Sequence, residues 1–290
     1  PPGRLMTYDP RYRGPNPPCA APFVDKGVLV MVLPEMEQAA LYDAINQDLT
    51  IFGRENRTVA AVRVGSYACP SDPEARPRAA DTTQIAGAGL VAAGEPLTMA
   101  FTSYSACYGS LDFHALPRPA SGCVVPPALA AQADGCFNDL APIRLASIGD
   151  GLSHTIFVSE KATTRFRALD AIDPVISARY GWYVAGNWGD TLMTTFYPPN
   201  MIRTVAALAG AAHTRAASSL HPGGLHALMG DGSVRFVSDS IDTWPFDPIT
   251  GAPAGATRQP GGWWENLPAP GIWQALATRT GGEVLGPGTP

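Results

Sequence analysis

The sequence predicts a mixed α and β fold that is rich in turns and dominated by short strands. The 30 glycines and 29 prolines make up about a fifth of the 290 residues and follow no repeat, which is typical of a chain with many turns. Residues 225–229 and 233–237 are strand-like runs on either side of a Gly-Asp-Gly turn, the signature of a β-hairpin. Residues 34–49 place an apolar side chain at every fourth position from residue 41, which predicts a helix.

The remaining elements follow from local signals. The helix is expected to begin at Pro34, because proline suits the first helical position and acidic residues follow it in the first turn. Strands are expected at residues 155–159, which follow a Gly-Asp-Gly turn, and at residues 180–184, which are aromatic and β-branched. A last short helix is expected at residues 272–279, where a pair of glycines ends it.

Composition and charge exclude several classes of protein. Apolar residues make up 46% and charged residues 16% of the chain, so it can bury a sizeable core. The net charge is −5 and no run of Lys or Arg occurs, which argues against a nucleic-acid partner and an anionic membrane surface. The longest apolar run, residues 28–33, is far shorter than the roughly 20 residues of a membrane-spanning helix. Because the chain opens on Pro1 and shows no signal peptide, we expect a processed product.

The five cysteines include three within thirty residues of a Gly/Pro-rich stretch, Cys107, Cys123 and Cys136. In an exported protein such a group predicts at least one disulfide, and we expect it among these three. No CxxC or HxxxH pattern occurs, so a tetrahedral zinc site is not expected. Catalysis by a free thiol stays open, although nothing in the sequence marks a partner histidine.

Five segments resemble, in the same order, motifs of one bacterial family. Nine residues separate His221 from the pair Asp231-Gly232, as in the family's H-x9-DG motif. The other four segments are residues 33–42 ("LPxxEQxxLY"), 69–72 ("CPSD"), 148–160 ("ITDGTSNTIxxxE") and 278–283 ("TRxGGE"). The opening Pro1-Pro2-Gly3 also resembles the segment that follows the family's N-terminal helix. The chain therefore resembles the DUF1559 family of prepilin-processed proteins, whose domain has no assigned function.

This resemblance implies an α+β fold, with an antiparallel β-sheet head of pilin-like type packed against a helix on its N-terminal side. The long apolar N-terminal helix of a complete member is absent from this chain. We expect a single domain over residues 1–290, with long loop insertions at about 101–141 and 245–270. His154 stands where the family usually has asparagine.

The resemblance also implies a non-enzymatic, pilin-like or pseudopilin-like subunit that is extracellular or held in the cell envelope. Its partners would be copies of itself, other pilin-like subunits or cell-envelope proteins, in an oligomer or a larger assembly. Contact with the membrane would be made only through the missing N-terminal helix. Two alternatives stay open. One is an extracellular binding module for carbohydrate or another envelope component, and the other is an unrecognised hydrolase.

No catalytic residue and no cofactor are predicted. An extended stretch from residue 224 to residue 231 would cover roughly 23 Å, so His221 and Asp231 are not expected to form a catalytic dyad. We expect Asp231 to make the turn and His221 to satisfy a local backbone group. Asp150, Asp231, Asp239 and Asp242 could offer oxygen ligands to Ca²⁺, although ordinary turn roles are the simpler interpretation.

Two adjacent tryptophans, Trp263 and Trp264, stand in a Gly/Pro-rich loop. Large apolar side chains left exposed usually mark an interface, and tryptophan is a frequent hot-spot residue. The pair is therefore the candidate contact surface for assembly. Packing into the core is the alternative.

Overall fold

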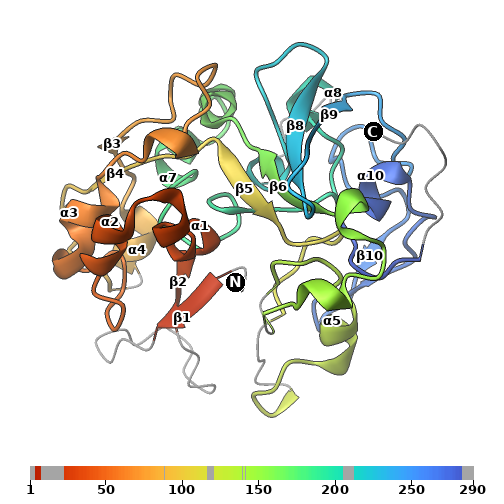
Figure 1. The fold of residues 1–290 in the computed structure, drawn as a ribbon, viewed down its shortest axis with the longest axis horizontal. Helices are drawn as coiled ribbons and strands as arrows, with labels where there is room; N and C mark the ends of the chain where they lie inside the picture. The colour runs from red at the N-terminus through yellow and green to blue at the C-terminus, as the bar shows by residue number, and fades with distance from the viewer. Residues whose placement is uncertain are drawn as a thin grey trace.

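The computed structural model describes residues 4–7, 23–87, 89–115, 121–138, 140, 142–204 and 212–282. At its centre is a five-stranded sheet, seen in the middle of Figure 1. Its strands, in spatial order, are β7 (Leu192–Met193), β5 (Tyr104–Cys107), β6 (Ile156–Glu160), β8 (Gly224–Met229) and β9 (Val234–Ser238). β5 and β7 are parallel, whereas the other neighbouring strands are antiparallel. The fold is therefore mixed α and β, built on a mixed sheet.

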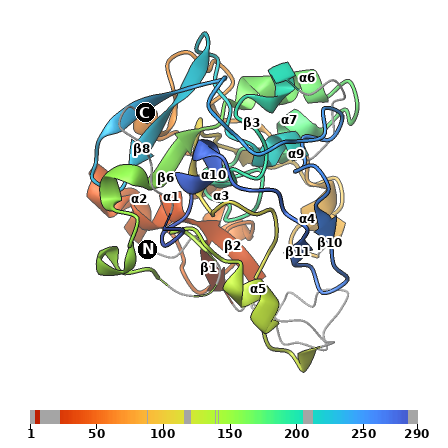
Figure 2. The same cartoon turned by 90° about the vertical axis from the view of Figure 1, so that its right-hand side faces the viewer.

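Short elements surround this sheet (Figures 1 and 2). Three two-stranded sheets pair β1 (Arg4–Thr7) with β2 (Phe23–Gly27), β3 (Arg78–Ala79) with β4 (Thr98–Met99), and β10 (Thr257–Arg258) with β11 (Trp264–Glu265). The α-helices are α1 (Val28–Met31), α2 (Ala39–Asp43), α3 (Arg57–Ala60), α4 (Thr83–Gly87), α5 (Pro127–Ala131), α6 (Phe166–Leu169), α7 (Ile176–Arg179), α8 (Met201–Thr204), α9 (Ala212–Arg215) and α10 (Ile272–Ala275). Within the described part of the chain, no helix has the length and apolar character needed to cross a membrane.

The predicted hairpin at residues 225–237 is confirmed as β8 and β9. The Asp231 carboxylate accepts hydrogen bonds from the backbone N–H and the hydroxyl of Ser233, at 2.9 and 2.6 Å. Gly232 has φ +87°, a left-handed conformation that glycine adopts without steric cost. The Asp-Gly half of the H-x9-DG motif therefore serves the turn.

The two faces of this hairpin differ in burial. Its inward face, which includes Leu225 and Val237, joins a hydrophobic cluster completed by Trp273 of α10. On its outward face, Val234 is 64% exposed and Phe236 is 46% exposed. The strand alternation thus leaves an apolar strip on the outside of the sheet.

The predicted helix over residues 34–49 is wrong in its length. The helical region begins earlier, at α1, and the left-handed backbone of Glu37 (φ +59°) separates a 3₁₀ turn, Pro34–Met36, from α2. Side chains from elsewhere then hold the carbonyls that a longer helix would use. Lys26 donates to the carbonyl of Leu49 at 2.7 Å, and Asn56 donates to the carbonyl of Asn46 at 3.0 Å.

Two expected strands had different outcomes. The strand at residues 155–159 is confirmed as β6, one residue later. Residues 180–184 do not form a strand, because Trp182 makes only an isolated bridge to Phe101. The backbone N–H groups of Gly181 and Trp182 bond instead to the carboxylate of Asp190, at 2.9 and 3.0 Å.

The two predicted insertions are partly integrated into the fold. The region 101–141 begins with β5, which lies inside the central sheet between β6 and β7. The region 245–270 carries the β10–β11 pair. The predicted C-terminal helix is present as α10 but ends at Ala275. Pro1-Pro2-Gly3 and the last residue of the segment 278–283 lie outside the described residues.

The predicted disulfide among Cys107, Cys123 and Cys136 does not form. Cys107 and Cys136 are free and buried, because Cys107 belongs to the central sheet and Cys136 to the core. Cys123 is disulfide-bonded, but not to Cys107 or Cys136. Burial raises the pKa of both free thiols, that of Cys136 to about 11, so both stay protonated near neutral pH.

Candidate functional site

Three side chains from distant segments meet on the outer side of the central sheet. They are Cys69, Glu160 and His221, whose ligand atoms all lie within 4.8 Å of one another. Nε2 of His221 is 3.7 Å from the Cys69 sulfur and 3.1 Å from Oε1 of Glu160. Each residue belongs to a different one of the five segments that resemble family motifs.

Cys69 is held in place by a buried acid three residues later. The backbone N–H of Cys69 donates to the hydroxyl of Ser103 at 3.0 Å, and that hydroxyl donates to Asp72 at 2.8 Å. Asp72 also accepts the backbone N–H groups of Thr163 and Thr164, at 2.8 and 3.0 Å. The acid of the CPSD segment thus ties the cysteine loop to the residues that follow β6.

Glu160 is the last residue of β6, and its side chain is only 5% exposed. Its Oε2 accepts the backbone N–H of His226 on the neighbouring strand β8, at 2.7 Å. The ring nitrogen Nδ1 of His226 lies 3.6 Å from the same oxygen. This arrangement orients the carboxylate and leaves Oε1 directed at His221.

His221 lies in the loop before β8. Its backbone N–H donates to the hydroxyl of Ser219 at 3.1 Å, and its carbonyl accepts a hydrogen bond from Arg203 at 2.9 Å. The side chain, 30% exposed, reaches across to β6 and the cysteine loop. The expectation that His221 satisfies a local backbone group is therefore wrong, because its ring contacts side chains of distant segments.

The three residues line a cavity of about 400 Å³. Tyr104 and Ser159 add polar groups, and an apolar rim is formed by Val158, Leu228 and Val234. Burial raises the pKa of Tyr104 to about 12, and Cys69 and Glu160 add to the shift, so the phenol stays protonated. We call this cavity the sheet-face pocket.

The other residues named from the sequence lie elsewhere. Asp231 is in the hairpin turn, and no hydrogen bond or ion pair joins it to His221 among the described residues. The four aspartates considered for Ca²⁺ do not come together, and each has protein donors of its own. Asp150 accepts from Gly281 and Gly282, Asp239 from Asn200 and Arg203, and Asp242 from Ile272.

The two loop tryptophans pack inward rather than standing free. The Trp264 ring lies 4.6 Å from the ring of Phe196, and its Nε1 donates to the carbonyl of Asp112 at 2.8 Å. Trp263 donates to Glu265 at 2.9 Å and packs against the main core. Both rings are therefore half-buried, which weakens the exposure on which their interface role depended.

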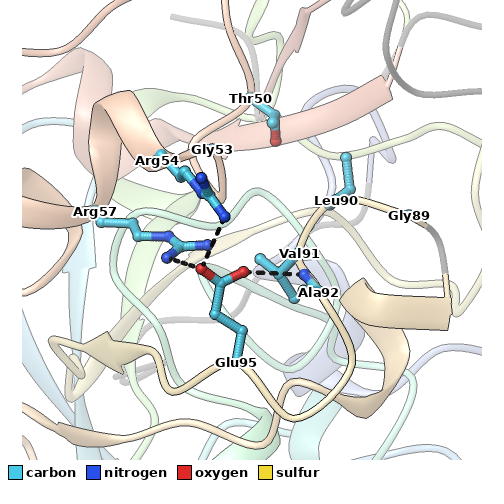
Figure 3. A pocket seen from close by; sticks show the side chains of 9 residues that line it. All are labelled: Thr50, Gly53, Arg54, Arg57, Gly89, Leu90, Val91, Ala92 and Glu95. Atoms are coloured by element: carbon cyan, nitrogen blue, oxygen red, sulfur yellow. Dashed lines mark hydrogen bonds and ion pairs between the residues drawn. The ribbon is translucent and has the colours of Figure 1, made fainter.

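A second cavity, of about 330 Å³, lies among α3 and the loops beside it (Figure 3). Glu95 is at its centre and binds Arg57 at 2.6 Å and Arg54 at 3.6 Å. Its other oxygen accepts the backbone N–H of Ala92 at 3.0 Å. Glu95 engages both arginines of the lining, and these ion pairs join two loops, so we assign the cavity a structural role.

Sequence reasoning did not select Cys69 or Glu160 as site residues, and it treated His221 only as a motif residue. The signal was present in the motif pattern, since the CPSD cysteine, the glutamate that ends the ITDG segment and the histidine of H-x9-DG are the three that meet. Spacing rules for metal ligands missed them, because those rules look for ligands close in sequence.

The family follows from a comparison with known protein families. A family model described as SBP_bac_10, "Protein of unknown function (DUF1559)", matches residues 3–243. The chain belongs to the DUF1559 family. In this DUF1559 protein the matched region contains Cys69, Glu160 and His221, whereas the segment 278–283 lies beyond it. No curated protein and no solved structure matches the chain.

Proposed function

We propose that this DUF1559 protein is a non-enzymatic binding head on the cell envelope and that it binds its ligand at the sheet-face pocket. The observation that carries the proposal is the convergence of Cys69, Glu160 and His221 from three separate motif segments. The Asp231-Gly232 pair and Asp72 have evident roles in folding, as a turn and a brace. Neither role requires that a thiol, a carboxylate and an imidazole share one cavity.

The shape and lining of the pocket suit a ligand. Its volume, about 400 Å³, lies within the roughly 300–1,000 Å³ of small-molecule sites. A polar base and an apolar rim are the usual combination in such sites, in which the polar groups fix orientation. The rim continues into the exposed Val234 and Phe236, an apolar strip that favours contact with a larger partner.

Two observations support a place in the cell envelope. The family motifs resemble those of prepilin-processed proteins, which are exported. Cys123 is disulfide-bonded, and disulfides persist mainly in oxidising compartments. Assembly with itself or with other pilin-like subunits belongs to this proposal, although the inward packing of Trp264 does not favour the tryptophan loop as the contact.

The location can be tested in the bacterium that encodes the protein. An epitope tag placed at Ile249, which is 58% exposed in a turn, should leave the core intact. We expect an impermeant antibody to reach the tag on cells whose outer layers are opened but whose cytoplasm is sealed. Recovery of the protein in the cytosolic fraction would overturn the proposed location.

Binding can be tested with labelled purified chain added to isolated envelopes of the same bacterium. We expect saturable binding that the unlabelled chain competes. Leu228→Glu places a charge on the pocket rim and should weaken binding at least about tenfold, which corresponds to about 1.4 kcal/mol. The matched control is Leu145→Glu, at a residue that is 58% exposed and outside the pocket. Absence of saturable binding, or equal loss in both variants, would refute the pocket as the binding site.

A further inference from the structure

We infer that Cys69, Glu160 and His221 form a zinc site with three protein ligands and a fourth position that opens into the sheet-face pocket. The inference deepens the proposed function and rests on it for the statement that the pocket receives a ligand. The existence of the metal site itself depends only on the geometry and chemistry of the three side chains.

The separations between the ligand atoms suit a tetrahedral zinc ion. Zinc bonds of about 2.3 Å to sulfur and about 2.0–2.1 Å to nitrogen or oxygen place ligand atoms about 3.4–3.6 Å apart around a tetrahedron. Two of the observed separations are 3.7 Å, between the Cys69 sulfur and Nε2 of His221, and 3.1 Å, between that nitrogen and Oε1 of Glu160. The third, between the Cys69 sulfur and the Glu160 carboxylate, is no more than 4.8 Å. Small shifts of the side chains would therefore admit the ion.

The donor set selects zinc over the harder cations. Thiolate and imidazole are ligands that zinc prefers, and a carboxylate completes many zinc sites. Ca²⁺ and Mg²⁺ require mainly oxygen ligands, and of the three clustered residues Glu160 alone supplies one. Structural zinc sites fill all four positions with protein ligands, whereas three protein ligands leave the fourth position for a water or a bound molecule.

A thiol–imidazole–carboxylate relay is the main alternative, and the contacts of His221 argue against it. In such a relay the imidazole contacts the nucleophile through one ring nitrogen and the acid through the other. Here Cys69 and Glu160 both approach the same nitrogen, Nε2. One ring nitrogen cannot pass a proton between two groups on its own side, whereas a metal ion bound to that nitrogen would contact both.

Charge at the site also favours a cation. The side chain of Glu160 is 5% exposed, and its ion-pair partners among the described residues are the imidazoles of His221 and His226. Buried charges are usually paired or bound to metal, so a divalent ion would compensate both the carboxylate and the thiolate.

Each ligand has the outer-shell support that metal sites require. Asp72 and Ser103 fix the backbone of Cys69, and the N–H of His226 fixes the second oxygen of Glu160. Arg203 holds the carbonyl of His221. Such partners restrict the orientation of the ligands, and their loss typically weakens metal binding about 10- to 100-fold.

The test uses the whole chain after treatment with a chelator and titration with ZnCl₂ by calorimetry. We expect one zinc ion per chain. Loss of an outer-shell partner weakens metal binding by at most roughly 100-fold. Loss of a ligand should weaken zinc binding by more than that, in each of the variants Cys69→Ser, Glu160→Gln and His221→Gln. Cys136→Ala and His154→Gln are the matched controls, because neither residue belongs to the cluster, and both should bind zinc as the wild type does.

A second measurement needs no variant and so does not depend on their folding. Co²⁺ added to the chelated wild-type chain should produce the intense visible absorption of a tetrahedral site and a thiolate-to-cobalt charge-transfer band. Absence of zinc uptake, an octahedral cobalt spectrum, or equal affinity in His221→Gln and the wild type would overturn the site. Rapid alkylation of Cys69 that zinc does not slow would also overturn it, in favour of a reactive thiol.

The two proposals can fail separately. Zinc binding by a chain that does not bind envelopes would refute the proposed function and leave the metal site standing. The opposite result would refute the metal site alone. In that case the chain takes up no zinc but still binds envelopes saturably, and Leu228→Glu weakens that binding.

Discussion

The sulfur of Cys69 lies 3.7 Å from Nε2 of His221, although 152 residues separate the two along the chain. The antiparallel pairing of β6 with β8 brings Glu160 beside His226 and the His221 loop. Ser103 is the residue before β5, and its hydroxyl accepts the backbone N–H of Cys69, which places the cysteine beside the same sheet. The central sheet is therefore the scaffold that assembles the site.

Asp72→Asn should destabilise the fold and loosen the cysteine loop. In the wild type, Ser103, Thr163 and Thr164 donate hydrogen bonds to the two carboxylate oxygens of Asp72. An asparagine keeps one acceptor oxygen but replaces the other with an NH₂ group, which cannot accept those bonds. Hydrogen bonds to charged groups contribute about 1.5–3 kcal/mol each, so we expect a loss of about 3 kcal/mol in the free energy of unfolding. Urea denaturation measures it, and Ser71→Ala, at an exposed neighbour, is the control. Equal stability of both variants would show that Asp72 is not a brace.

Lys161→Met should be strongly destabilising. Burial lowers the pKa of Lys161 and raises that of Asp190, and the attraction between the two charges partly opposes both shifts. Removing the lysine would leave buried Asp190 without the positive charge of Lys161, at a cost of about 3–5 kcal/mol.

Adding Asp190→Asn to Lys161→Met should recover part of that loss. The asparagine can keep the oxygen that accepts the N–H groups of Gly181 and Trp182. A double-mutant cycle on the free energies of unfolding checks the coupling. Strictly additive losses would mean that the two residues act independently.

The Glu95 ion pair predicts a specific dependence of stability on pH. The hydrogen bond from Arg57, helped by the N–H of Ala92, lowers the pKa of Glu95 from 4.5 to about 2. A depressed carboxyl pKa stabilises the folded state above the unfolded value and loses that effect as the pH falls. The difference in urea midpoint between wild type and Glu95→Gln should therefore be full above pH 4.5 and vanish near pH 2. Arg57→Gln should remove the larger share of this pH-dependent part, because Ala92 and Arg54 still act on Glu95. A difference that stays constant across this pH range would contradict the assignment.

Trp264→Ala should reduce stability, because its ring packs on Phe196 and its Nε1 bonds to the carbonyl of Asp112. Full loss of a buried tryptophan costs about 3–5 kcal/mol, so we expect about 2 kcal/mol for this half-buried ring. Trp263→Ala should cost less. Thermal and urea unfolding of the two single variants measure these losses of stability. If Trp264→Ala is as stable as the wild type, Trp264 again becomes a candidate interface residue.

Local signals predicted those parts of the fold that are made within one short segment. The β8–β9 hairpin follows from alternation around Gly-Asp-Gly, and its turn uses the aspartate and glycine that the sequence marks. The strand β6 and the start of α10 were also predictable. The hairpin is made by residues only a few positions apart, whereas β6, although its local pattern marks it as a strand, pairs with the distant strands β5 and β8.

The helix at residues 34–49 and the strand at residues 180–184 failed for the opposite reason. Lys26 and Asn56 hold the carbonyls of Leu49 and Asn46 in a non-helical path. The carboxylate of Asp190 takes the N–H groups that a strand would have paired. Side-chain hydrogen bonds from residues 8 to 23 positions away outweighed local propensity at these two places.

The sequence by itself determined the family, the hairpin and the order of the motif segments. Only the tertiary structure decided that Cys69, Glu160 and His221 share one pocket and that Asp231 does not join them. The physical reason is that turns and strand alternation arise from neighbouring residues, whereas a site of this kind depends on which strands pair. That pairing is set by burial of the whole core, so no spacing within the sequence reveals it.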